Sequence, residues 1–176
     1  MRIDVTASVL CVIDVQERLV AAMADAERVV ARCRRLADAA RLLGAPAVLT
    51  EQYPRGLGRT VPSLASVLPA PIEKMSFSCM GASAFAAAVP VGSVAVLCGL
   101  ETHVCVAQTA LDLLASGRDV AVVVDAVTSR HAIDHEVALR RLEQAGAVLT
   151  TSEAVLFEWT RTAEHPRFQD VRQLVR

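Results

Sequence analysis

Aromatic residues are scarce in this 176-residue chain, at 3% of the total, with one Trp, one Tyr and four Phe. Its core must therefore be built mainly from aliphatic residues, since apolar residues as a whole amount to 53%. The chain also lacks an excess of either charge, because 18 basic and 19 acidic residues leave a formal net charge of −1. A nucleic-acid-binding face needs clustered positive charge, so this balance argues against a nucleic-acid partner.

No apolar run approaches the length of a membrane span, which argues against a membrane partner. The N-terminal run VLCVIDV (9–15) is too short for a signal peptide and carries Asp14 within it. The five cysteines are odd in number and show no paired spacing, which suits a reducing cytoplasm better than a disulfide scaffold. The length fits a single domain over residues 1–176. These observations together predict a cytoplasmic globular protein.

Short apolar runs alternate with longer helical patterns along the chain. The predicted strands are 9–15, 46–52, 70–75, 93–100, 119–127 and 147–151. The predicted helices are 16–43, 82–89, 102–116, 129–145, 152–162 and 165–175. Most strands are continuously apolar, as strands buried on both faces are, and such alternation favours parallel strands with helical crossovers. The sequence thus predicts a three-layer α/β/α sandwich around a mainly parallel six-stranded sheet, with a long loop at 53–64.

Ligands of such sheets bind beyond the carboxyl ends of the strands, and three reactive residues fall there. Asp14 ends the first predicted strand, Lys74 ends the third, and Cys105 follows the fourth. Thr102 is a plausible N-cap that puts Cys105 in the first helical turn, where the helix dipole lowers a thiol pKa. Each residue also has an ordinary interpretation, as an N-cap, a solvated lysine or a core cysteine. Together they form a possible base, thiolate stabiliser and nucleophile.

Other motifs are weaker. GLGRT (56–60) is only part of a dinucleotide fingerprint and does not lie on a strand-to-helix turn. His131 and His135 lie one helical turn apart but lack a clear third ligand, so a solvated helix face is the better interpretation. Cys11 and Cys98 lie in predicted strands and are interpreted as core, whereas Cys33 and Cys79 have no identifiable partner. The sequence therefore predicts neither a metal site nor a cofactor.

Five segments together resemble the isochorismatase-like cysteine hydrolases, most closely the branch of isochorismatase domain-containing proteins. They are CVIDVQERL, TEQYPRGLGRTVPSL, EKMSFSC, LCGLETHVCVAQTALDLLASGRDVAVVVDAVTSR and FEWTRTAEHPRF. The resemblance covers nearly the whole chain, and it implies a Rossmann-like form of the α/β/α sandwich.

The same resemblance assigns roles to individual residues. It makes Cys105 the nucleophile, Asp14 the general base and Lys74 the electrostatic partner of Asp14. It implies a cis peptide bond between Leu100 and Glu101, which in relatives turns the backbone amides of Glu101 and Cys105 toward the substrate oxygen. Those two amides would form an oxyanion hole. We add a group of candidate substrate-binding residues beside that set, namely Gln16, Gln52, Phe77 and Leu100.

Two departures from known relatives narrow the expected activity. Isochorismatases proper cleave a vinyl ether without a catalytic cysteine, so Cys105 favours cleavage of a C–N bond in a small amide- or ureide-type substrate through a thioester. Nicotinamidases commonly carry an Asp/His metal site after the second strand, where this chain reads TEQYPRG without histidine. Two alternatives stay open: a scaffold or interaction protein that retains the three residues, and a vinyl-ether hydrolase. Apolar residues in AVLFEW and FQDVRQLV predict homo-oligomerisation.

Overall fold

The computed structural model describes residues 1–176 and contains one six-stranded sheet in which every strand pairing is parallel. The strand order is β3-β2-β1-β4-β5-β6. The strands are β1 (Ser8–Ile13), β2 (Ala47–Gln52), β3 (Ile72–Lys74), β4 (Val94–Leu100), β5 (Asp119–Thr128) and β6 (Val148–Thr150). All six lie at the predicted positions, with β3 and β6 shorter than expected.

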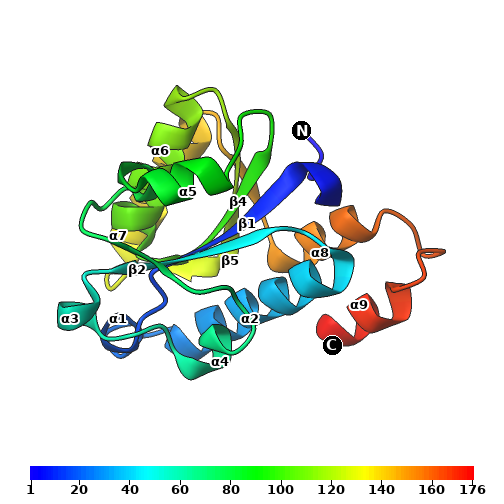
Figure 1. The fold of residues 1–176 in the computed structure, drawn as a ribbon, viewed down its shortest axis with the longest axis horizontal. Helices are drawn as coiled ribbons and strands as arrows, with labels where there is room; N and C mark the ends of the chain where they lie inside the picture. Colours follow the sequence, from blue (N-terminus) through cyan, green and yellow to red (C-terminus); the bar gives the residue numbers. More distant parts are fainter.

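Helices cover both faces of this sheet, as Figure 1 shows. On one face lie α2 (Ala26–Leu43), α8 (Ser152–Thr160) and α9 (Phe168–Leu174). On the other lie α5 (Ser83–Ala88), α6 (Ala107–Ala115) and α7 (Ala132–Gln144). Each interface between helices and sheet holds its own apolar core. The predicted three-layer α/β/α sandwich is therefore confirmed.

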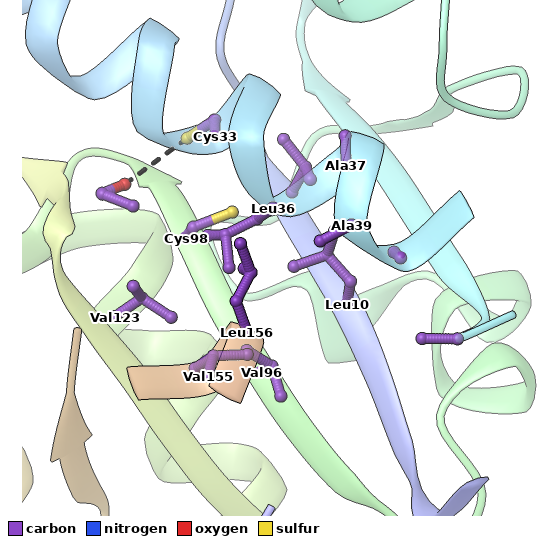
Figure 2. Close-up of a cluster of buried hydrophobic side chains, with 14 of the residues drawn as sticks. Leu10, Cys33, Leu36, Ala37, Ala39, Val96, Cys98, Val123, Val155 and Leu156 are labelled. Carbon is purple, nitrogen blue, oxygen red and sulfur yellow. Dashed lines mark hydrogen bonds between the residues drawn. The ribbon is translucent and has the colours of Figure 1, made fainter. Parts of the chain in front are cut away.

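The two cores explain why the central strands are apolar along their whole length. Every residue of β1 and of β4 is buried, because helices cover both sides of both strands. Figure 2 shows the core beneath α2, where Leu36 lies near Leu10 of β1 and Cys98 of β4. Cys33, which had no identifiable partner in the sequence, lies in the same core, and its thiol donates to the carbonyl oxygen of Ala126 at 3.5 Å.

The predicted helix 16–43 is two helices, α1 (Glu17–Val20) and α2, separated by a turn. The Glu17 amide donates to the Arg59 carbonyl at 3.0 Å, which fixes α1 against the long loop, whereas α2 packs on the sheet. This division follows from contacts distant in sequence, so helical periodicity does not display it. The loop itself contains two one-turn helices, α3 (Pro54–Leu57) and α4 (Pro62–Ala65), each of which begins with proline.

The predicted helix 102–116 begins as a π-helical turn, η3 (Thr102–Val106), that continues into α6. The sequence suggested Thr102 as the N-cap of this helix, but Glu101 holds that position and makes no side-chain capping bond. Two further short turns, η1 (Val5–Ala7) and η2 (Cys79–Gly81), complete the helical elements. No helix of the chain combines the length and apolarity that crossing a membrane requires.

Gly99 controls how closely β4 approaches β1. Its φ is +116°, and a Cβ atom placed there would lie 2.0 Å from the carbonyl oxygen of Ile13. The pairing between β4 and β5 shifts register between Leu97 and Gly99, and the peptide bond between Leu100 and Glu101 is cis. Only glycine fits this conformation and this contact, so the strand pair closes tightly just before Asp14.

Candidate active site

The carboxyl ends of the strands bring Asp14, Lys74 and Cys105 to one place. Asp14 follows β1, Lys74 is the last residue of β3, and Cys105 lies on η3 just after β4. Their exposed fractions are 0%, 5% and 5%, so the cluster is almost closed to bulk water. The three residues predicted at separate strand ends thus belong to one buried group, where parallel sheets place their ligand sites.

Asp14 and Lys74 form a buried ion pair, with Lys74 Nζ 2.7 Å from Asp14 Oδ2. The ammonium also donates to Gln52 Oε1 at 2.8 Å and to the Phe77 carbonyl at 3.1 Å. Burial acts to lower the pKa of Lys74, but the charge of Asp14, the nearby Cys79 and Cys105 and the hydrogen bond to Asp14 together outweigh it, and the pKa lies above its usual value. Lys74 is therefore a fixed positive charge rather than a solvated residue.

The Asp14 carboxylate is held at both oxygens. Thr50 Oγ1 donates to Oδ1 at 2.7 Å, opposite the Lys74 contact on Oδ2. Asp14 itself has a φ of +51°, a left-handed conformation that aspartate tolerates better than most residues. The alternative interpretation of Asp14 as a helix N-cap is wrong, because Gln16 occupies the cap position of α1.

The pKa of the Cys105 thiol lies above that of an exposed thiol. Burial raises its pKa, the charge of Asp14 raises it further, and the positive charge of Lys74 only partly opposes them. The sequence predicted a lowered pKa from a position in the first turn of a helix, and the structure gives the opposite direction. The reason is that the thiol lies in a dry site beside a carboxylate, which disfavours a second negative charge. A protonated thiol thus faces a group that can accept its proton.

Sequence reasoning missed two neighbours of this group, Thr50 and Cys79. Cys79 Sγ lies 3.7 Å from Thr50 Oγ1, and the Cys79 amide donates to Thr109 Oγ1 at 2.9 Å. Burial, followed by the charge of Asp14, raises the pKa of the Cys79 thiol to about 11. The sequence does contain a signal for Thr50. Side chains alternate between the two faces of a strand, so Thr50 lies on the same face of β2 as Gln52, which was already a candidate site residue.

The four candidate substrate-binding residues fall into different environments. Gln16 is fully buried, and its amide is bonded to the backbone of Gln52 and Gly58. Leu100 is 1% exposed and belongs to the core beneath α2. Gln16 thus ties the loop to β2 and Leu100 packs the interior, and a contact of either residue with substrate stays a prediction.

Gln52 and Phe77 do lie at the site. The Gln52 side chain accepts from Lys74 and donates to the Met75 carbonyl at 2.8 Å, so it orients the ammonium. Phe77 is 54% exposed, while its carbonyl oxygen contacts Lys74. Phe77 is thus an exposed residue whose backbone contacts the buried ammonium, and its contact with substrate stays a prediction.

Glu101, the residue after Leu100, is buried and receives hydrogen bonds from Arg130. The Arg130 amide donates to Glu101 Oε2 at 2.9 Å, and Nε of the same residue lies 3.2 Å from that oxygen. His103, also on η3, has its Nδ1 3.0 Å from Ser129 Oγ. The turn that carries Cys105 is thereby fastened to the end of β5.

The two histidines of α7 are arranged differently from each other. His135 Nδ1 lies 2.9 Å from Thr102 Oγ1, and burial lowers the pKa of His135, whereas His131 is exposed at the N-cap of α7. No group of three or more His, Cys, Asp or Glu side chains in residues 1–176 is arranged to hold a metal ion. The expectation of a solvated helix face holds for His131 but not for His135, which supports η3.

Comparison with known proteins gives consistent results over nearly the whole chain. Residues 8–154 match the isochorismatase domain family. Isochorismatase domain-containing protein 2 of Bos taurus is 48% identical over 151 residues, covering 85% of this chain and 74% of that protein. A solved structure described as MAR1 ribonuclease from Caenorhabditis elegans superposes with a TM-score of 0.91 at 43% identity, covering 99% and 92% of the two chains. The YcaC gene product of Escherichia coli, described as an octameric hydrolase of unknown specificity, gives a TM-score of 0.87 at 27% identity and covers 99% and 95%.

Proposed function

This chain belongs to the isochorismatase family, and from that premise we propose that it is a cysteine-dependent hydrolase of a small amide- or ureide-type substrate. The observation that carries the proposal is the neutral Cys105 thiol beside the buried Asp14–Lys74 ion pair. A nucleophile, a base and a fixed positive charge are the groups that cleavage of a C–N bond through a thioester requires.

The reaction begins with proton transfer. Asp14 takes the proton of Cys105 as the sulfur attacks the substrate carbonyl carbon, so the thiolate is formed only when it is used. This order suits a thiol whose pKa is raised by burial and by the Asp14 charge. Lys74 compensates the negative charge that passes between the carboxylate and the sulfur, because its ammonium lies 2.7 Å from Asp14.

Two later steps complete the turnover. The carbonyl oxygen becomes an oxyanion that accepts hydrogen bonds from the backbone amides of Glu101 and Cys105. The C–N bond then breaks, protonated Asp14 returns its proton to the leaving nitrogen, and a thioester to Cys105 remains. Water that Asp14 deprotonates attacks the thioester, and the thiol is restored with release of the acid.

Three other functions stay in view as outcomes of the test. The chain is an interaction protein if Cys105 is intact but no substrate is turned over. It is a vinyl-ether hydrolase if turnover survives the loss of Cys105. It is a nuclease, like the activity named for the Caenorhabditis elegans structure, if RNA is degraded; the balanced charge of the chain, −1 overall, favours the small-molecule hypothesis.

The experiment measures ammonia release from a panel of small amides and ureides, with RNA and a vinyl ether as further substrates. Cys105→Ala should abolish ammonia release, and intact mass should detect an acyl adduct in the wild type during turnover. The matched control is Cys33→Ala, which removes a buried thiol from the core on the opposite face of the sheet. Ammonia release that persists in Cys105→Ala would overturn the assignment of the nucleophile.

A further inference from the structure

Thr50 lies next to Asp14 because of the sheet register. Thr50 of β2 pairs with Ile13 of β1, and the Asp14 amide donates to the Thr50 carbonyl at 3.2 Å. The Thr50 hydroxyl, on a fully buried residue, is 2.7 Å from Asp14 Oδ1. Because each carboxylate oxygen thus has its own donor, the orientation of the carboxylate is set by Thr50 on one side and by Lys74 on the other.

Asp14 fixes the direction of the Thr50 hydroxyl, and Cys79 completes its contacts. A threonine hydroxyl has one proton, and an ionised carboxylate can only accept, so that proton points to Asp14. The Thr50 oxygen is left as an acceptor for the Cys79 thiol, whose sulfur lies 3.7 Å away. Burial raises the pKa of Cys79 to about 11, so this thiol keeps its proton at neutral pH. The contacts therefore run in one direction, from Cys79 to Thr50 to Asp14.

We propose that Thr50 is a positioning residue of the reaction: its hydroxyl holds the Asp14 carboxylate in the orientation that receives the Cys105 proton and activates water. The inference rests on the proposed function, and it deepens that function by adding a residue that acts through Asp14. Thr50 acts on the Asp14 carboxylate, whose Oδ1 its hydroxyl contacts at 2.7 Å. Its effect should therefore disappear when Asp14 can no longer ionise.

Thr50→Val tests this with little change in side-chain volume. Without the hydroxyl, the Asp14 carboxylate is no longer held toward Cys105 and receives its proton less readily, while the negative charge beside the thiol remains, so alkylation of Cys105 by iodoacetamide should require a pH higher by roughly one unit. On a turned-over substrate, kcat should fall about 10- to 100-fold with little change in KM, because the carboxylate is no longer held in the productive direction. Thr50→Ser, which restores the hydroxyl, should recover both properties.

Two controls separate positioning from a structural role. Thr160→Val removes a buried hydroxyl that bonds to the Leu156 carbonyl in α8, so it should leave the pH dependence of alkylation unchanged. In an Asp14→Asn background, Thr50→Val should produce no further shift, because Thr50 acts only through the ionised carboxylate. If Thr50→Val does not fold, Thr50→Ala also lacks the hydroxyl and should show the same shift.

The alkylation readout needs no substrate, so it distinguishes the two proposals. A shift in Thr50→Val that vanishes in the Asp14→Asn background supports the positioning role even if no amide is turned over. Alkylation that is unchanged in folded Thr50→Val, with a loss of thermal stability like that of Thr160→Val, would overturn it. Turnover that needs Cys105 but has the same kcat in Thr50→Val would do so as well, while leaving the proposed hydrolase intact.

Discussion

Asp14 and Lys74 lie 60 residues apart in the chain, yet the ammonium nitrogen of Lys74 approaches Asp14 Oδ2 to 2.7 Å. Both side chains are removed from solvent, with 0% of the Asp14 side chain and 1% of the Lys74 side chain exposed. Each charge is acceptable at this depth because the other is present and because Thr50 and Gln52 supply further hydrogen bonds. The ion pair therefore contributes to the stability of the fold and also to the chemistry proposed for Cys105.

Removal of the Lys74 ammonium should lower both the unfolding free energy of the protein and the reactivity of Cys105. Lys74→Met leaves Asp14 as an unpaired buried charge, which should cost about 3–5 kcal/mol of unfolding free energy. Because Lys74 lowers the pKa of Cys105, the variant should also alkylate at higher pH than the wild type. Urea unfolding and pH-dependent alkylation measure the two effects. Glu73→Gln, at a half-exposed neighbour, is the control, and wild-type stability in Lys74→Met would contradict the ion-pair argument.

Asp14→Asn should separate reactivity from turnover. The Asp14 charge raises the pKa of Cys105, so its removal should shift alkylation to lower pH. Ammonia release should nevertheless be lost, since amide nitrogen cannot accept the thiol proton or activate water. An Asp14→Asn protein that alkylates at the wild-type pH would show that the carboxylate does not control the thiol.

Stability should fall in alkaline solution. Burial raises the pKa values of Cys11 and Cys105 above that of an exposed thiol and that of Cys79 to about 11, and a hydrogen bond with Cys33, followed by burial, raises the pKa of Cys98. Above a pH of about 8.5 the unfolded chain releases thiol protons that the folded chain retains, so unfolding becomes easier by roughly 1.4 kcal/mol per thiol for each pH unit. Lys74, whose folded pKa is also raised, adds to the loss above a pH of about 10.4.

Urea unfolding between pH 7 and pH 10.5 measures this loss. Cys79→Ala should give a shallower decline, because one of the retained protons is gone. Equal unfolding free energies across that range would show that the folded chain retains no more thiol protons than the unfolded chain.

Activity, once a substrate is found, should not require a divalent metal. The loop after β2 has no histidine, and Asp14, Lys74 and Cys105 suffice for the proposed steps. Dialysis against a chelator should leave the rate of ammonia release unchanged. Loss on chelation with recovery on addition of zinc would contradict the prediction.

The chain should form a homo-oligomer. The apolar residues of AVLFEW, on which the sequence-based prediction depended, do not support it, because Leu156 and Trp159 are buried in the core of the same chain. Large apolar side chains remain exposed elsewhere, at Met75 (71%), Phe77 (54%) and Ile133 (62%), and the Escherichia coli relative is described as octameric. Light scattering at micromolar concentration measures the mass; a value near the 18.8 kDa of one chain would contradict the prediction.

The sheet was predictable because most of its strands are short and continuously apolar, and because they alternate with helical patterns along the chain. The location of Asp14 and Lys74 was also predictable, because parallel strands deliver their carboxyl ends to one edge. The division between α1 and α2 was not predictable, because it depends on a hydrogen bond from the Glu17 amide to the carbonyl of Arg59, which is 42 residues away in the loop. Contacts of that kind leave no periodic trace in the sequence.

The pKa of Cys105 shows why local position did not suffice. Sequence spacing placed the thiol at a helix start, where a lower pKa is expected, but the burial of the site and the charge of Asp14 determine the opposite direction. Gln16 illustrates the same difficulty for polar residues. Its place after Asp14 suggested substrate contact, and only the fold reveals that its amide is used by the backbone of Gln52 and Gly58.

Gly99 carries a consequence for how distant relatives should be interpreted. A single added methyl group at this position would meet the carbonyl oxygen of Ile13 and would force β4 away from β1. Asp14 follows β1 and Cys105 follows β4, so that separation would move the base away from the sulfur although neither residue had changed. A homologue that keeps the aspartate, the lysine and the cysteine but bears a side chain at this position should therefore not be credited with the same chemistry.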